Sequence, residues 1–169
     1  MRLSRTRLGA AVDVPVAPDR EIVRDVHLII GVAAIALNAL AGLWGAWRWW
    51  RIASPGPFWR LLRAGQLAVV IEVADGGVEV ALGHKLSTLH LVYGLLPLLV
   101  AFIAEALRLS SAEMVLAARG YESAADVGRQ PPEEQRAVAT AIFQREMGVM
   151  ALAALVVVVL LARAAMTAG

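Results

Sequence analysis

The stretch MALAALVVVVLLARAAM, residues 150–166, decides the fold class because it is apolar around its whole circumference, with Arg163 as its one charged residue. A helix of a soluble protein would keep a polar face, and no such face can be drawn here. About 20 residues of this kind are enough to cross the ~30 Å hydrocarbon core of a bilayer. The stretch therefore predicts a membrane-spanning helix and an integral membrane protein.

The composition supports the same class and limits the chemistry. Of the 169 residues, 59% are hydrophobic, 18% are charged and none is cysteine. Without cysteine the chain can form no disulfide, iron–sulfur cluster or covalently attached c-type haem, so a metal would need His, carboxylate or Met ligands. The sequence pI of about 9.7 reflects an arginine-rich rim suited to anionic lipid, and we infer no nucleic-acid binding from it.

Three further apolar runs predict an all-α, four-transmembrane-helix bundle. The first residues carry arginines but no apolar core with a small-residue cleavage site, so we interpret residues 1–22 as a polar tail and not as a signal peptide. Residues 23–169 then form a single transmembrane domain. Its four spans are expected at about 25–47, 57–80, 87–109 and 141–165.

The 110–138 segment is expected to be a surface connection between the last two spans. Ser110 and Glu113 stand at capping-box spacing and Gly120 is a typical stop, which together predict a short amphipathic helix. A proline pair, Pro131 and Pro132, then starts the helix that leads into the last span.

Positive charge predicts the orientation in the cell (inner) membrane. Nine arginines lie on the side that holds the turn after the first span and the 110–138 connection, against seven basic residues on the other side. The positive-inside rule then puts both hairpin loops in the cytoplasm and both termini outside.

Near their starts, the first and third predicted spans carry nearly the same five-residue sequence, each with a histidine in first place. HLIIG runs from His27 to Gly31, and HLVYG runs from His90 to Gly94. Each return helix contains Phe-x-Arg, as FWR at 58–60 and as FQR at 143–145. The repeat predicts two tandem helical hairpins related by a pseudo-two-fold axis along the membrane normal, which puts the two histidines at equal depth.

A matched histidine pair on opposite helices of a four-helix bundle is the arrangement that axial ligation of a haem iron needs. Gly31 and Gly94 lie one turn deeper on the same helix faces, where a missing side chain leaves room for a flat macrocycle. Arg24 is expected to pair with a propionate. The alternative stays open that the histidines are ordinary interfacial residues and the glycines ordinary helix contacts.

The order of a His-x-x-x-Gly helix, a Trp/Arg-rich turn, a helix with Gln66 and a second His-x-x-x-Gly helix resembles a widespread set of small four-helix membrane proteins of high-GC bacteria. In plan it is similar to four-helix membrane cytochromes of the b type and to one half of haem A synthase. The resemblance covers roughly residues 20–165 and implies His27 and His90 as axial ligands of haem b. The chain departs from those families because it lacks a second His pair toward the opposite face, which electron transfer right across the membrane through two haems would require.

A second constellation lies in the same region of the chain. Glu72, Asp75 and Glu79 stand at i, i+3 and i+7, which is one stripe of a helix, and acids at membrane depth are costly enough to indicate function. With His84 and the paired histidines they predict a divalent-cation site or a proton relay. If the helix instead ends near Ala74, the acids belong to a solvated loop.

Three function hypotheses follow from these residues. The leading one is a small b-type haem-binding membrane protein with an electron-transfer or quinone-linked role, in which the acidic stripe handles protons or a quinone-like substrate. The second is a non-catalytic accessory or assembly subunit of a larger membrane complex, with 110–138 as its docking surface. The third is a metal-ion site or transporter, which would need a homo-oligomer to make a path. The expected partners are membrane lipid, a quinone or larger complex, and further copies of the chain.

Overall fold

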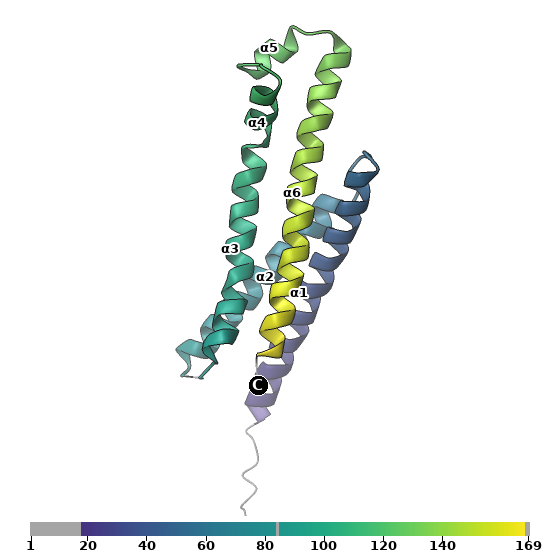
Figure 1. The fold of residues 1–169 in the computed structure, drawn as a ribbon. Helices are drawn as coiled ribbons and strands as arrows, with labels where there is room; N and C mark the ends of the chain where they lie inside the picture. Colours follow the sequence, from purple (N-terminus) through teal and green to yellow (C-terminus); the bar gives the residue numbers. More distant parts are fainter. Residues whose placement is uncertain (1–17, 84, 168–169) are drawn as a thin grey trace, which may run out of the picture.

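Six α-helices make up the part of the protein that the computed structural model describes, residues 18–83 and 85–167, and this part contains no strand. The expected polar tail lies outside the described residues as far as residue 17. The helices are α1 (Pro18–Trp50), α2 (Phe58–Ala81), α3 (Thr88–Leu109), α4 (Ser111–Ala118), α5 (Ala124–Gly128) and α6 (Pro132–Met166). Figure 1 shows α3, α6 and α1 alongside one another with α2 behind them, and α4 and α5 at one end of the α3–α6 pair.

Three of the long helices are long and apolar enough to cross a membrane. They are α3, α6 and the Asp25–Trp50 part of α1. Large apolar side chains cover their outer faces, as at Phe102, which is 73% exposed. Such a surface suits lipid and not water. The prediction of an all-helical protein with membrane-type helices is confirmed to this extent. α2 falls outside the group because it carries five charged residues, Arg60, Arg63, Glu72, Asp75 and Glu79.

Small residues let α1 approach its neighbours closely. α1 packs along both α2 and α6, α3 packs along α6, and α2 and α3 touch only over a short length. A Cβ added to Gly42 would lie 2.7 Å from Leu155 Cδ2, and one added to Gly45 would lie 2.9 Å from Ala151 Cβ. Such distances leave no room for a side chain, so glycine sets the α1–α6 separation.

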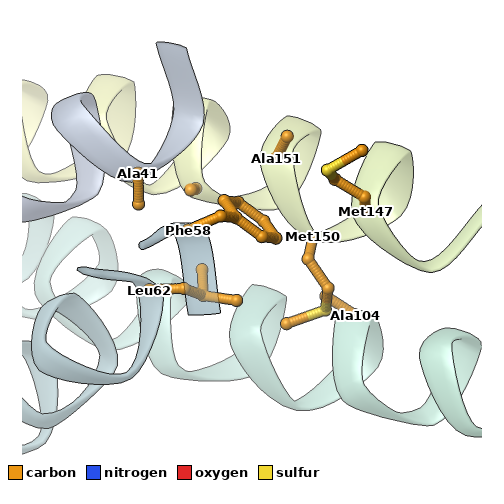
Figure 2. Close-up of a cluster of buried hydrophobic side chains, with 8 residues drawn as sticks. Ala41, Phe58, Leu62, Ala104, Met147, Met150 and Ala151 are labelled. Carbon is orange, nitrogen blue, oxygen red and sulfur yellow. The ribbon is translucent and has the colours of Figure 1, made fainter. Parts of the chain in front are cut away.

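The core lies where the α1–α2 hairpin meets α6. Phe58, the first residue of α2, is 0% exposed, and Figure 2 shows its ring between Ala41 and Ala151. A second cluster lies further along the same three helices, toward Leu161 of α6. It contains Ala34, Ala68, Val69, Val157 and Leu161. These two clusters align α1, α2 and α6 and leave α3 to be positioned mainly by α6.

A polar cluster joins α2 to α3 near one end of both helices. Glu105 of α3 forms an ion pair with Arg63, accepts a hydrogen bond from Gln66 Nε2 at 3.1 Å, and accepts another from Arg108 Nε at 2.9 Å. Arg108 also lies over the Trp59 ring, with its Cζ atom 5.8 Å from the ring centroid, which is within the ~6 Å of a cation–π contact. This cluster, which we call the Glu105 clasp, holds together the two helices that otherwise touch least.

Glu105→Ala is expected to lower the free energy of unfolding by about 1–2 kcal/mol, because Arg63 and Arg108 lose the carboxylate that they share. The measurement is thermal unfolding of the purified protein in detergent, followed by helical circular dichroism. Glu133→Ala removes an exposed acid from the start of α6 and serves as the control. Equal unfolding temperatures for the two variants would contradict a stabilising role of the clasp.

The connection between α3 and α6 is helical and stands clear of the rest of the bundle. Gly148 packs against Trp49, since a Cβ there would lie 2.9 Å from Trp49 Nε1, so α1 ends level with Gly148. The 16 residues of α6 that precede Gly148 therefore extend ~24 Å beyond α1. Figure 1 shows this extension, with α4 and α5 against it.

Side-chain contacts hold the connection in place. Tyr121 donates a hydrogen bond to Glu134 Oε1 at 3.2 Å, and Arg119 pairs with the same oxygen at 3.1 Å. Desolvation, and after it the Glu134 carboxylate, raises the pKa of the Tyr121 phenol above its ordinary value. The predicted capping box of Ser110 is not formed, because α4 follows α3 after a single residue and the Ser110 hydroxyl donates to the Leu107 carbonyl at 3.1 Å.

Candidate functional site

The two histidines that the sequence pairs are neighbours in space. His27 lies on α1 and His90 lies in the first turn of α3, and their ring centroids are 6.1 Å apart with the ring planes tilted by 51°. Both side chains are half-buried. Ser87 fixes the start of α3, since its hydroxyl oxygen accepts a hydrogen bond from the His90 backbone N–H at 3.2 Å. The pairing therefore depends on where α3 begins.

Each imidazole has an acceptor at its Nδ1 atom. His27 Nδ1 donates to Asp75 Oδ2 at 2.9 Å, and His90 Nδ1 donates to the Ala164 carbonyl oxygen at 3.0 Å. A carbonyl oxygen can only accept, so Nδ1 of His90 carries a proton, and in the neutral ring Nε2 keeps a lone pair. In His27 both ring nitrogens face a carboxylate, Nδ1 that of Asp75 at 2.9 Å and Nε2 that of Glu72 at 3.3 Å, and the shorter contact favours the proton on Nδ1. Metal-binding histidines are typically held this way through the nitrogen that does not bind the metal.

A cavity of about 450 Å³ lies between α1, α2, α3 and α6, and both histidines line it. Apart from the histidines and Glu72, its walls are apolar or glycine. A Cβ added to Gly76, Gly77 or Gly94 would meet no atom of the described chain within 4 Å. The cavity is therefore open beside α2 and α3, and its few polar groups converge at the histidines.

The acidic stripe belongs to this same site. α2 stays helical through Gly76 and Gly77 as far as Ala81, which excludes the solvated-loop alternative. Glu72 Oε1 lies 3.3 Å from His27 Nε2, and ligand atoms of His27, Asp75 and Glu79 all lie within 4.8 Å of one another. From the sequence, the histidine pair and the acids are expected to form two alternative sites. In the structure they form one site, because His27 contacts both Glu72 and Asp75.

Glu72 is the least satisfied polar group of the site. Its side chain is only 14% exposed, and its Oε2 atom is buried without a hydrogen-bond partner in the described residues. An unpaired buried oxygen costs about 1–3 kcal/mol, so this part of the cavity lacks a donor or a cation. The side chain lies over Gly31, where an added Cβ would be 2.9 Å from Glu72 Oε1. Gly31 thus makes room for Glu72, while Gly94 opens onto the cavity.

Two of the predicted site residues are not placed in the cavity by the structure. His84 lies outside the described residues. Arg24 is in the early part of α1, three residues before His27, and the course of its side chain is outside the described part.

One contact was missed by the sequence analysis altogether. The Ala164 carbonyl that holds His90 is a backbone group near the end of α6, and residue type gives no signal for such an acceptor. Ser87 did carry a signal, as the residue at the start of the 87–109 span. Its hydroxyl also donates to the Thr167 carbonyl at 2.9 Å, which ties the start of α3 to the end of α6.

Comparison with known proteins gives this chain no relative. No protein family, curated protein or solved structure matches it. Its function is therefore argued from the geometry of the site.

Proposed function

We propose that the protein binds one haem b between His27 and His90 and acts as a small electron-transfer protein of the cell (inner) membrane. The observation that supports this most is the pair of neighbouring imidazoles that line one apolar cavity, each with Nδ1 in a hydrogen bond. This leaves the Nε2 atoms to bind a metal, and that of His27 would exchange its 3.3 Å contact with Glu72 Oε1 for the metal. The resemblance to b-type membrane cytochromes is part of this proposal.

The proposal includes α2 as a fourth span, so that α1–α2 and α3–α6 form the two hairpins. α2 has 24 residues, or ~36 Å, which is enough to cross the hydrocarbon. Charges in a span must face protein, water or a partner. Glu72 and Asp75 contact His27, and Arg63 contacts Glu105, which supports this condition. The arginine bias favours cytoplasmic hairpin loops and outer termini.

The separation of the rings favours two ligands on opposite sides of one iron. With metal–nitrogen bonds of about 2.0 Å, opposite imidazoles have ring centroids roughly 6 Å apart, whereas two imidazoles of a tetrahedral ion have them roughly 5 Å apart. The observed 6.1 Å agrees with the first arrangement.

The cavity suits a flat, largely apolar group. Its volume of about 450 Å³ lies in the range of roughly 300–1,000 Å³ that cofactor sites occupy. Gly76, Gly77 and Gly94 leave its walls without side chains. Glu72 would have to leave its position over Gly31, and its long side chain can do so by giving up a single contact with His27.

Haem held by two histidines supplies reversible one-electron transfer. The chain's part is to hold the two imidazoles in one orientation through Asp75 and Ala164 and to exclude water with the apolar wall. A membrane quinone is the electron partner that a bilayer-embedded site of this kind would meet, and Arg24 remains the proposed partner of a propionate.

A divalent metal ion is the second proposed ligand, because specific contacts favour it. Glu79 and Asp75 bring carboxylate oxygens to His27, and Glu72 Oε2 has no partner among the described residues. Nitrogen and oxygen ligands of this kind suit first-row transition metals. The accessory-subunit hypothesis stays a prediction.

The test is the absorption spectrum of the wild-type protein, purified in detergent from cells supplied with a haem precursor. We expect a Soret band, a low-spin spectrum and about one haem per chain, with iron confirmed by elemental analysis. Colourless protein under these conditions would overturn the haem proposal. Stoichiometric zinc or manganese in colourless protein would support the divalent-ion proposal instead.

A further inference from the structure

We infer that Asp75 is a positioning residue that lowers the reduction potential of an iron bound to His27, and that the two histidines are unequal as ligands. The inference rests on the proposed haem function. It concerns how the chain controls that site, and it follows from what stands behind each imidazole.

Asp75 stands behind His27 with a full negative charge. Its Oδ2 atom accepts the Nδ1 proton at 2.9 Å, which is a charge-assisted hydrogen bond. A carboxylate that draws this proton toward itself gives the ring imidazolate character and makes Nε2 a stronger electron donor. A stronger donor stabilises the ferric iron more than the ferrous iron, because the ferric iron carries the higher charge.

A neutral group stands behind His90. The Ala164 carbonyl oxygen that accepts from His90 Nδ1 also accepts from the Thr167 backbone N–H at 3.0 Å and from the Thr167 hydroxyl at 2.9 Å. It lies at the C-terminal end of α6, where the helix dipole amounts to about half a negative charge. An acceptor shared by three donors draws less on each proton, so His90 is the weaker electron donor of the two.

The remaining charges near His27 act in the same direction. Glu79 belongs to the same cluster, with a ligand atom within 4.8 Å of those of His27 and Asp75. In the described part of the chain, the ion pairs of Glu72 and Asp75 are with His27 alone, and neither has an Arg or Lys partner. Uncompensated negative charge in a low-dielectric site favours the oxidised iron.

Redox titration of the haem-loaded protein, with graded soluble reductants and the Soret band as readout, tests the inference. Asp75→Asn keeps an oxygen that accepts from Nδ1 but removes the charge, so haem should stay bound and the midpoint potential should become more positive. Asp75→Glu should return it toward the wild-type value. Glu133→Gln is the matched control, since it removes one acid 31 residues, or ~46 Å, before Ala164 on the same helix.

An unchanged midpoint potential in haem-loaded Asp75→Asn would overturn the inference. If Asp75→Asn loses haem, the midpoint potential of Glu79→Gln tests the inference instead. This variant removes a charge from the cluster and leaves the hydrogen bond between His27 Nδ1 and Asp75 intact. The inference then requires a smaller positive shift, and no shift overturns it. Absence of haem from the wild-type protein is a different result, which overturns the proposed function and the inference with it.

Discussion

His27→Ala and His90→Ala are each expected to abolish the low-spin Soret spectrum of protein purified with haem, and the double variant is expected to retain at most about a tenth of the wild-type haem. Each substitution removes one of the two proposed Nε2 ligands, and even loss of a residue that merely supports a metal ligand costs about 10–100-fold in affinity. The measurement is the haem-to-protein ratio with the absorption spectrum, alongside helical circular dichroism.

The third histidine supplies the matched control for this result. His84→Ala should keep the wild-type spectrum if His27 and His90 are the axial ligands, and the same variant should lose affinity if the site is a divalent-ion site that includes His84. A full Soret band in the double His27/His90 variant would rule out the axial assignment. Loss of helical content in both single variants would point to a structural role instead.

Gly45→Val is expected to destabilise the fold strongly and to lower the yield of folded protein. A Cβ at Gly45 would lie 2.8 Å from Phe58 Cδ2 and 2.9 Å from Ala151 Cβ, and Phe58 is fully buried. Overpacking of a well-packed core costs about 1–3 kcal/mol and sometimes more, which is a large part of a typical stability of ~5–15 kcal/mol. The measurement is the yield of monodisperse protein on gel filtration in detergent, with the unfolding temperature of what remains.

Gly77→Val is the matched control, because the same change is made at a helical glycine whose Cβ would meet no atom of the described chain within 4 Å. This variant should fold with near wild-type stability. Gly77 lines the cavity, however, so its haem content should fall. Similar yields for the Gly45 and Gly77 variants would mean that the α1–α6 contact does not limit stability.

The helices could be predicted from the sequence because their signals are local. The expected 57–80 and 87–109 spans lie within one residue of α2 and α3 at each end, since apolar run length and the flanking turn residues fix such boundaries. The cap at Ser110 was wrong, and the capping box of the structure joins Ser123 to Asp126. A cap depends on whether the preceding chain is itself helical, and spacing alone does not reveal this.

The sequence named the residues of the candidate site but did not predict the contacts between the acids and the histidines. Asp75 lies 48 positions from His27, and only the register of α1 against α2 brings the two together. No sequence period encodes that register, so the acids and the histidines looked like separate sites. The repeat stays a prediction, and its Phe-x-Arg motifs differ in environment, with Phe58 buried and Phe143 58% exposed.

α6 also makes a mechanical link between the two ends of the molecule. It is one uninterrupted helix from Pro132 to Met166, and Ala164 near its far end holds the His90 ring. The arm beyond α1 is ~24 Å long, so a sideways force applied there by lipid headgroups or another protein acts with leverage on the opposite end. A tilt of α6 would move the Ala164 carbonyl and so change the orientation of the His90 imidazole, even if the force acted far from the cavity.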